Sequence, residues 1–423
     1  MDVFSWSIMG LSLAIWLGLW LGRGQFWRAE PQLERREKQS TAEQSTAKKN
    51  SQGLELEPWP AVGVVIPARN EAELLPQTLR SHLQQNYPGK LTIILVDDQS
   101  TDGTAQVAQQ VAQSLDKSDQ LKIVLADPLP SDWTGKLWAM EQGMRQIQSL
   151  DPVPQYVLFT DADIEHHSTN LRQLVTHAEQ ENLSLASLMV RLRCVGFWEQ
   201  LLIPAFVFFF QKLYPFAWVN DPQKNIAAAA GGCILIRRDV LEEIGGLKEI
   251  RQTLIDDCAL AKVVKCNLSA ERADIDAPPH AATRHIWLGL SDSTHSLRPY
   301  PSLASIWNMV ARTAFTQLEY SPILLLATLA AMTLIYLVPP IGTILAAIAG
   351  RWEIAAIGGL TWLLMTRLYW PMVRFYRCPP VLALCLPAIA LLYTLMTADS
   401  ALRHWQGRGG AWKGRTYELR AED

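Results

Sequence analysis

The sequence predicts an α/β domain built on a mainly parallel sheet, with hydrophobic segments before and after it that are candidates to enter a membrane. Three observations support this prediction. Short apolar runs alternate with helical patterns from residue 62 to residue 115, aspartate pairs follow several such runs, and long uncharged stretches lie near both ends of the 423-residue chain. Alternating strands and helices are typical of βαβ units, in which consecutive strands are parallel.

The first 57 residues are predicted to be a membrane anchor and a linker. Residues 4–21 carry no charge and are long enough to cross a bilayer as a helix. The stretch lacks a basic start and an Ala-x-Ala site, so we expect an uncleaved anchor over residues 1–22. The basic residues that follow it place the next part of the chain in the cytoplasm. Residues 23–57 are expected to be a flexible linker, since Gln, Ser, Glu and Lys are abundant there.

Two strand–helix units are predicted from residue 62 onward. Residues 62–66 are mostly β-branched and apolar, and this strand is expected to stop at Pro67. Leucines at positions 75, 79 and 83 then mark the buried side of a helix. Residues 91–96 form the second predicted strand, and the helix after it has Asp102 or Ser100 as its expected N-cap.

Polar residues occupy the loops after these two strands. The carboxyl ends of parallel strands meet at one edge of a sheet, so the two loops should form a crevice of nucleotide size. The chain has neither a Gly-x-Gly-x-x-Gly motif nor a P-loop, which argues against NAD enzymes and P-loop NTPases. Asp97, at the mouth of its strand, is favoured as a contact to a base or ribose. The candidate donor-binding residues here are Pro67, Arg69, Asn70, Glu71, Asp97 and Asp98.

A third predicted strand, residues 156–159, leads directly into Asp161 and Asp163. Two carboxylates this close repel each other unless a cation or a proton lies between them. Oxygen ligands suit Mg²⁺ or Mn²⁺, so both aspartates are candidate metal ligands. Taken alone, such a pair is more often a solvated turn, and the other acid pairs give it weight. His166 and His167, which follow, are expected to be an exposed turn pair rather than metal ligands.

Asp256 and Asp257 precede an apolar helical pattern. One interpretation is helix capping, because acidic residues at a helix N-terminus are favoured by the macrodipole. The other is a general base, because a carboxylate near a bound anion can have a raised pKa and accept a hydroxyl proton.

The order of these motifs resembles that of the inverting family 2 glycosyltransferases, which have the GT-A fold. The resemblance extends from about residue 59 to residue 298. It rests on the motifs at residues 64–71, 96–104, 161–163 and 256–257. Further stretches resemble the hopene-associated glycosyltransferases, a name that implies a place beside hopanoid genes. These stretches are residues 128–139, 204–210, 213–220, 227–233 and 255–260.

The resemblance implies roles for individual residues. Asp97 would hold the nucleobase, and Asp161 would lie near the ribose or the metal. Asp163 would bind the divalent metal, Mg²⁺ or Mn²⁺, that bridges the donor diphosphate. Lys136 matches a basic position that approaches the donor. Asp257 would be the base that deprotonates the acceptor hydroxyl.

One motif of many membrane members, Gln-x-x-Arg-Trp after the base, is absent. Arg298 lies at about the right distance and could act as the diphosphate clamp, since a guanidinium suits phosphate. A structural salt bridge is almost as good an interpretation for Arg298. The net charge of −3 gives no indication of nucleic-acid binding, and the six cysteines lack metal-type spacing.

Three apolar stretches near the C-terminus, residues 322–337, 354–370 and 381–396, are predicted to lie in the membrane as part of a transmembrane region over residues 321–398. The pair Pro339-Pro340 is expected to break the first, and residues 341–349 either prolong it or form a separate segment. Three crossings would leave the basic tail, residues 399–423, outside. We therefore expect two or four crossings, or one re-entrant segment, in a multi-pass plasma or inner membrane protein.

The catalytic domain is predicted to occupy residues 58–300 and to contain one unusual stretch, residues 197–218. Its apolar run, residues 201–210, is too short to cross a bilayer, and aromatic residues flank it. It could be an interfacial helix that lets a lipid acceptor reach the base, or a buried core helix. Residues 301–320 are predicted to be a second interfacial segment.

The sequence therefore predicts a membrane-bound inverting glycosyltransferase that moves a sugar from a nucleotide-diphosphate sugar to a lipid hydroxyl, of isoprenoid or hopanoid type. A polyprenyl-phosphate or carotenoid glycosyltransferase with the same site is the alternative enzyme. A membrane scaffold with a degenerate nucleotide-binding domain is a weaker alternative, because all the acidic motifs are present.

Overall fold

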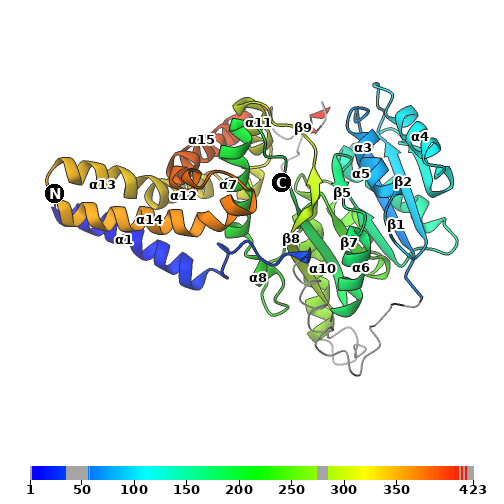
Figure 1. The fold of residues 1–423 in the computed structure, drawn as a ribbon, viewed down its shortest axis with the longest axis horizontal. Coiled ribbons are helices and arrows are strands. Elements are labelled where there is room, and N and C mark those ends of the chain that lie inside the picture. The colour runs from blue at the N-terminus through cyan, green and yellow to red at the C-terminus, as the bar shows by residue number, and fades with distance from the viewer. Residues whose placement is uncertain are drawn as a thin grey trace. The chain divides into compact units, whose positions relative to one another are not determined.

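A computed structural model describes residues 2–34, 56, 58–273, 284–408, 411–412 and 415–416. The chain divides into two compact units (Figure 1). Unit 1 comprises Met1–Ala29, Arg193–Ala217 and Pro299–Asp423, and unit 2 comprises Glu30–Leu192 and Trp218–Arg298.

Unit 2 is built on a mixed sheet which, among the described residues, has eight strands in the order β3-β2-β1-β4-β7-β6-β8-β5. The first four strands in this order are parallel, as expected for βαβ units. Strand β7 runs antiparallel to both of its neighbours, and β5 runs antiparallel to β8. The strands are β1 (Val62–Ala68), β2 (Leu91–Asp97), β3 (Leu121–Leu125), β4 (Tyr156–Phe159), β5 (Ile164–His166), β6 (Leu183–Arg191), β7 (Ile234–Arg237) and β8 (His285–Ser296).

Helices cover this sheet, and the apolar side predicted for the first of them is buried. Leu75, Leu79 and Leu83 of α3 are all buried in the main core of the unit, together with Val64 and Leu95 of the strands. The helices are α3 (Leu75–Leu83), α4 (Thr104–Ser114), α5 (Gly135–Gln148), α6 (Asn170–Gln180), α9 (Arg238–Glu243) and α10 (Asp256–Ala273), and the 3-10 turns are η1 (Ser118–Gln120) and η2 (Gly246–Ile250). The short helix α8 (Phe216–Val219) lies where the chain passes between the units.

The first strand does not stop at Pro67, contrary to the expectation from the sequence. Strand β1 continues to Ala68, and Pro67 pairs in register with Val96 of β2. Strand β4 covers only Val62–Val65 of β1, so the other side of β1 is open at Pro67. A proline is tolerated where a strand has an open edge, because its missing N–H needs no partner there.

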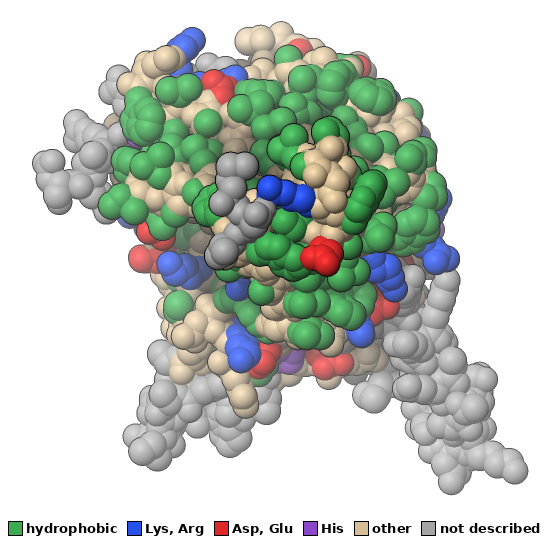
Figure 2. Space-filling model, turned by 90° about the vertical axis from the view of Figure 1, so that its left-hand side faces the viewer, with side chains coloured by type: hydrophobic (Ala, Val, Ile, Leu, Met, Phe, Trp, Pro, Cys, Tyr) green, Lys and Arg blue, Asp and Glu red, His purple; other side chains and the backbone are tan. Residues whose placement is uncertain are grey.

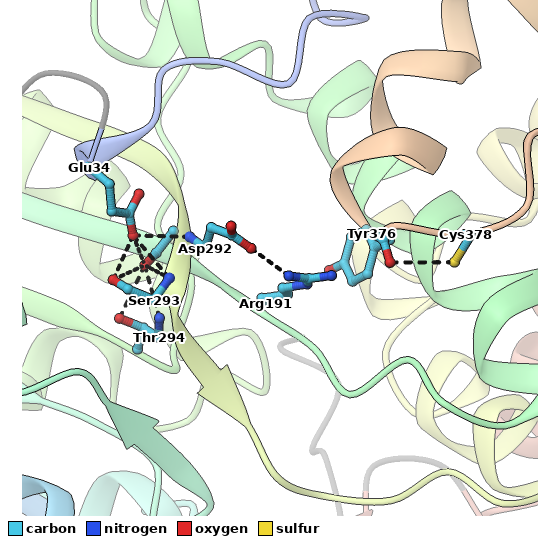
Figure 3. A network of polar contacts seen from close by, with 8 residues as sticks. Glu34, Arg191, Asp292, Ser293, Thr294, Tyr376 and Cys378 are labelled. Carbon is cyan, nitrogen blue, oxygen red and sulfur yellow. Dashed lines mark hydrogen bonds and ion pairs between the residues drawn. The ribbon is translucent and has the colours of Figure 1, made fainter. Parts of the chain in front are cut away.

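The start of the expected linker packs on β8. Gln32 forms an isolated bridge with Leu290, and Leu33 is buried in the core. The carboxylate of Glu34 accepts hydrogen bonds from the Ser291 and Ser293 side chains and from the backbone N–H groups of Asp292 and Ser293 in β8 (Figure 3). Residues 35–55 and 57 of this linker lie outside the described residues.

Unit 1 is helical. Its longer elements are α1 (Asp2–Gly22), α7 (Phe197–Leu213), α11 (Leu303–Ala311), α12 (Pro322–Met332), α13 (Val338–Ile348), α14 (Trp352–Phe375) and α15 (Leu386–Trp405). Shorter turns are η4 (Thr316–Leu318) and η6 (Pro380–Cys385), and a small hairpin joins β9 (Ala411–Trp412) to β10 (Arg415–Thr416). Hydrophobic side chains cover much of one face of the molecule (Figure 2). Large apolar residues of α1, α12 and α13 are highly exposed, with Leu21 at 76%, Ile323 at 78% and Ile348 at 80%.

Pro339 and Pro340 do not break the helix that contains them. A π-helical turn, η5 (Thr333–Leu337), joins α12 to α13, so the helical path runs from Pro322 to Ile348. A proline leaves the carbonyl four residues earlier without its usual N–H partner. Here that carbonyl belongs to Ile335, and it accepts a hydrogen bond from the indole of Trp16 at 2.8 Å. Of the two possibilities for residues 341–349, prolonging the helix is confirmed.

Four helical stretches among the described residues are long and apolar enough to cross a membrane, judged by length and composition: Phe4–Gly22, Phe197–Val219, Pro322–Ile348 and Pro380–Trp405. The second one is longer than the sequence led us to expect, because α7 and α8 together extend the apolar run. Among these four stretches it is also the most buried, at 56% against 17% for the first. Phe209 of α7 packs edge-on against Tyr336 and Tyr393, as a core helix of unit 1 would.

Candidate functional site

The loops after β1 and β2 are joined to each other by side-chain hydrogen bonds. The backbone N–H of Asn70 donates to Ser100 Oγ at 3.0 Å, and the Asn70 amide oxygen accepts from Thr101 N at 2.9 Å. Asp102 accepts from the N–H groups of Ala72 and Thr104, so it caps α4 even though the N-cap position itself is Gly103. These bonds hold the two loops together, and they give Asn70 a structural role. The crevice expected between the loops stays a prediction.

The predicted base contact, Asp97, is buried at the end of β2 and accepts the backbone N–H of Ser100 at 2.9 Å. Its neighbour Asp98 is almost fully buried and pairs with Arg69, whose guanidinium also donates to the Asp98 carbonyl. Asp97 and Arg69 therefore lie close together where β2 and β1 end, as expected for the motifs that follow two neighbouring parallel strands. Whether they contact a nucleotide stays a prediction.

Lys136 joins the aspartates of two separate motifs. It lies in the first turn of α5, and its Nζ is 3.0 Å from Asp161 Oδ1 and 3.0 Å from Asp256 Oδ2. Burial alone would lower the pKa of Lys136, but the carboxylates of Asp161, Asp256 and Asp257 raise it, so the side chain is an ammonium. Elements that lie about 120 residues apart in the chain thus meet at one charged cluster.

Asp257 is held by backbone groups on both of its oxygens. Oδ2 accepts from Gly231 N at 2.8 Å and Oδ1 accepts from Cys258 N at 2.7 Å. Burial, and next the neighbouring Asp256 carboxylate, raise the pKa of Asp257 to about 6. A carboxylate that ionises near neutral pH is a suitable proton acceptor, and its orientation is fixed by the loop before β7.

Asp163 meets a different set of partners. The short strand β5 pairs with the end of β8, with Ile164 opposite Ser296, and this pairing brings the residues after β8 to the aspartate. Ser296 Oγ donates to Asp163 Oδ2 at 2.8 Å, and Arg298 Nε lies 3.3 Å from the same oxygen. Arg298 also pairs with Glu71 at 2.6 Å. Both interpretations of Arg298 remain open, since the salt bridge is real and the guanidinium lies beside a predicted metal ligand.

His166 is buried, and the expectation that it is part of an exposed turn is wrong. Its ring contacts Thr160 Oγ1 at 3.1 Å and the Asn170 side-chain amide at 2.8 Å, and it packs against His82 with ring centroids 4.4 Å apart. Burial lowers the pKa of His82 to about 4 and that of His166 well below the usual value. Both rings are therefore neutral at physiological pH, and they support Thr160, which directly precedes Asp161. His167 is exposed, as expected.

Asp161 and Asp163 suit a divalent cation by their chemistry. Partial burial, together with the nearby charges of Asp163 and Asp256, raises the pKa of Asp161, and Lys136 opposes this shift. An excess of neighbouring carboxylates is the setting in which a hard cation is favoured. Among the described residues no group of three or more His, Cys, Asp or Glu side chains could hold a metal by itself. A cation here would need further oxygen ligands, and Mg²⁺ commonly takes these from substrate phosphates and water.

Residues 63–245 match the family model for glycosyl transferase family 2. This segment is a family 2 glycosyltransferase domain. Its fold, a curled mixed sheet covered by helices, is GT-A. The chain is similar over 94% of its length to a mannosyltransferase of Pyrobaculum calidifontis whose structure contains GDP-mannose and Mn²⁺; the TM-score is 0.50, the identity is 17%, and 99% of that chain is covered. At this identity the likeness concerns the fold alone.

Curated relatives are similar over shorter parts of the chain. A 4,4'-diaponeurosporenoate glycosyltransferase of Staphylococcus haemolyticus is 29% identical over 130 residues, which is 30% of this chain and 31% of the relative. The probable glycosyltransferase YdaM of Bacillus subtilis is 28% identical over 208 residues, 48% of this chain and 44% of the relative. The chain thus spans less than half the length of these relatives.

Three site residues have roles that the sequence did not reveal. Ser296 contacts Asp163, Asp256 pairs with Lys136, and Gly231 holds Asp257. The backbone at Gly231 approaches this cluster closely, since an added Cβ would lie 3.1 Å from Lys136 Nζ and 3.5 Å from Asp257 Oδ2, and the ammonium would have to shift slightly. In the sequence, the pair Gly231-Gly232 is compatible with close backbone approach, but it does not indicate which residue lies opposite.

Proposed function

We propose that the chain is a membrane-bound inverting glycosyltransferase that transfers a sugar from a nucleotide-diphosphate sugar to the hydroxyl group of a lipid. The observation that carries this proposal is the meeting of four separate segments in unit 2, whose residues 63–245 match the family 2 model. They bring together Lys136, Asp161, Asp163, Asp257 and Arg298. A scaffold would have no need of a carboxylate with a pKa near 6 beside a cluster of opposed charges.

The donor site follows from the positions of these residues. The loops after β1 and β2, with Asp97 and Arg69, would take the nucleoside. Asp161 and Asp163 would hold Mg²⁺ or Mn²⁺, which when bound would neutralise charge on the diphosphate as it leaves. Lys136 and Arg298 bring two further positive charges to the same place.

The acceptor step uses Asp257. Its carboxylate takes the proton of the acceptor hydroxyl while that oxygen attacks the anomeric carbon from the face opposite the phosphate. The bond from the anomeric carbon to the phosphate oxygen breaks, and its electron pair leaves with the nucleoside diphosphate. One displacement inverts the anomeric centre, so no covalent intermediate and no enzyme nucleophile are required.

The acceptor class is inferred from unit 1. Four of the helical stretches that the structure describes are long and apolar enough to cross a membrane, and basic residues follow the first. We therefore infer a multi-pass membrane protein with the catalytic domain in the cytoplasm. Of residues 197–218, all but Trp218 belong to the helical unit, and this stretch is inferred to border the path of the lipid. The resemblance to hopene-associated enzymes favours a hopanoid or other isoprenoid alcohol. The carotenoid-acid relative favours a carotenoid as the second candidate.

Lipid mass spectrometry of a deletion strain tests this function. The expected result is loss of one glycosylated lipid with accumulation of its aglycone, restored by the wild-type gene but not by Asp257→Asn. An unchanged lipid profile, with the glycan profile altered instead, would contradict a lipid acceptor.

A further inference from the structure

Lys136 occupies the position between acidic residues where a metal ion would be expected. Its ammonium group is 3.0 Å from Asp161 and 3.0 Å from Asp256, and its side chain is only 18% exposed. The backbone at Gly231 closes the same space, since a Cβ there would lie 3.1 Å from Nζ. A protein cation therefore neutralises one of the two predicted metal ligands.

A divalent cation and this ammonium cannot both be close to Asp161 without strong repulsion. A metal bound to the carboxylate would lie about 2 Å from its oxygen, and Lys136 Nζ is 3.0 Å from Oδ1 of the same group. In a partly buried cluster such like charges interact far more strongly than in water. Lys136 at 3.0 Å from Oδ1 therefore opposes metal binding at Asp161, and this opposition falls when the ammonium moves away.

A diphosphate supplies the force for that movement. Its oxygens attract the ammonium, and they also complete the shell of oxygen ligands that the two aspartates alone do not provide. Asp256 remains as a second partner for Lys136 at 3.0 Å, so the lysine need not leave the cluster. Arg298 is paired with Asp163 in a similar way, and Glu71 can retain it.

We propose that Lys136 is the resident cation of this acidic cluster and that it makes metal binding depend on the donor diphosphate. The inference rests on the proposed function, because it needs a nucleotide-diphosphate donor. Linkage then requires reciprocity: the diphosphate raises metal affinity by the same factor by which the metal raises diphosphate affinity. Without a nucleotide, the site would bind the metal weakly.

Calorimetry on the full chain in detergent tests the proposal with MnCl₂ as the probe, alone and with saturating UDP or GDP. Wild-type protein is expected to bind Mn²⁺ at least about ten-fold more tightly with the nucleotide than without it. In Lys136→Gln, Mn²⁺ alone is expected to bind about ten-fold more tightly than to wild type, and the effect of the nucleotide on metal affinity should shrink. Lys136→Arg keeps the cation and should keep the dependence. Lys122→Gln, an exposed lysine on β3, is the matched control and should behave as wild type.

Thermal unfolding gives a second readout, because loss of Lys136 leaves carboxylates without their cation. MnCl₂ without nucleotide should raise the melting temperature of Lys136→Gln by more than that of wild type. If wild-type protein binds Mn²⁺ equally well with and without nucleotide, the proposal is overturned, whether or not the variant folds. If the nucleotide binds with the metal but Lys136→Gln leaves metal affinity unchanged, this inference alone fails. If neither UDP nor GDP binds under any condition, the proposed function fails as well.

Discussion

Replacing Asp257 by asparagine removes the proposed base while leaving its shape unchanged. General-base catalysis contributes about 10²–10⁴-fold to rate, so turnover of Asp257→Asn should fall by at least about 10²-fold. The asparagine amide can accept only one of the two backbone N–H bonds that Asp257 accepts, from Gly231 and Cys258. The other N–H would lose its partner at a cost of about 1–3 kcal/mol in folding stability, offset in part by relief of the repulsion from Asp256.

The assay is release of nucleoside diphosphate by the full chain in detergent, with a lipid extract of the host membrane as the acceptor source. Donor affinity, measured by calorimetry, should stay within about three-fold of wild type, because the loss is in the chemical step. Asp119→Asn, an exposed aspartate of η1, is the matched control and should have wild-type turnover.

The pH profile adds a test that a merely structural role for Asp257 would not pass. The pKa of Asp257 is raised to about 6, and the base must be ionised to work, so kcat/KM of wild type should rise with pH through about 6 and then level off. In Asp257→Asn this acidic limb should vanish. Turnover near wild type, or an unchanged limb, would refute the assignment and make Asp256 the next candidate.

Three further outcomes are expected. EDTA should abolish most of the affinity for a nucleoside diphosphate in calorimetry, and equal affinity with and without EDTA would rule out the metal. Replacing both Phe206 and Phe209 by serine should lower glycosylation of the lipid about ten-fold or more, since burying each ring is worth roughly 2 kcal/mol. Hydrolysis of the nucleotide sugar should stay unchanged. Because Phe209 packs on two tyrosines, the melting temperature is measured too, and unfolding of the variant would mean that this apolar run is only core. His82 is neutral in the folded protein with a pKa of about 4, whereas an unfolded histidine ionises near 6.5. The folding stability of wild type should therefore fall by up to about 3 kcal/mol as the pH drops from 6.5 toward 4. Thermal melts should show a weaker pH dependence for His82→Gln, and the same pH dependence in both proteins would contradict this reasoning.

Local patterns sufficed to predict much of the donor half of the site. The strands before Asp97 and Asp161 were visible as apolar β-branched runs, and the rule that ligands bind at the carboxyl ends of parallel strands placed both acids at one edge. Leucine spacing gave α3 correctly, because its buried side faces a single core.

Long-range contacts could not be predicted in this way. Nothing in the local sequence shows that a three-residue strand, β5, pairs with the end of β8 and so brings Arg298 to Asp163. The burial of His166 depends on the same pairing and on α3, which supplies His82. The Ile335 carbonyl, which Pro339 leaves without its usual helical partner, accepts a hydrogen bond from Trp16, more than 300 residues earlier in the chain. In each case the deciding partner is distant in sequence.

The arrangement around Asp257 also bears on which kind of acceptor the site suits. A polyprenyl phosphate is already an anion at neutral pH, so it can attack the donor without a general base. It would also have to approach Asp256 and Asp257, whose charges are only partly balanced by Lys136. A neutral hydroxyl meets neither obstacle, and it needs a proton acceptor, which Asp257 with a pKa of about 6 would provide. The electrostatics of the cluster therefore favour an alcohol over a phosphate as the acceptor, and a phosphate acceptor would be indicated if Asp257→Asn left turnover unchanged in the presence of such a lipid.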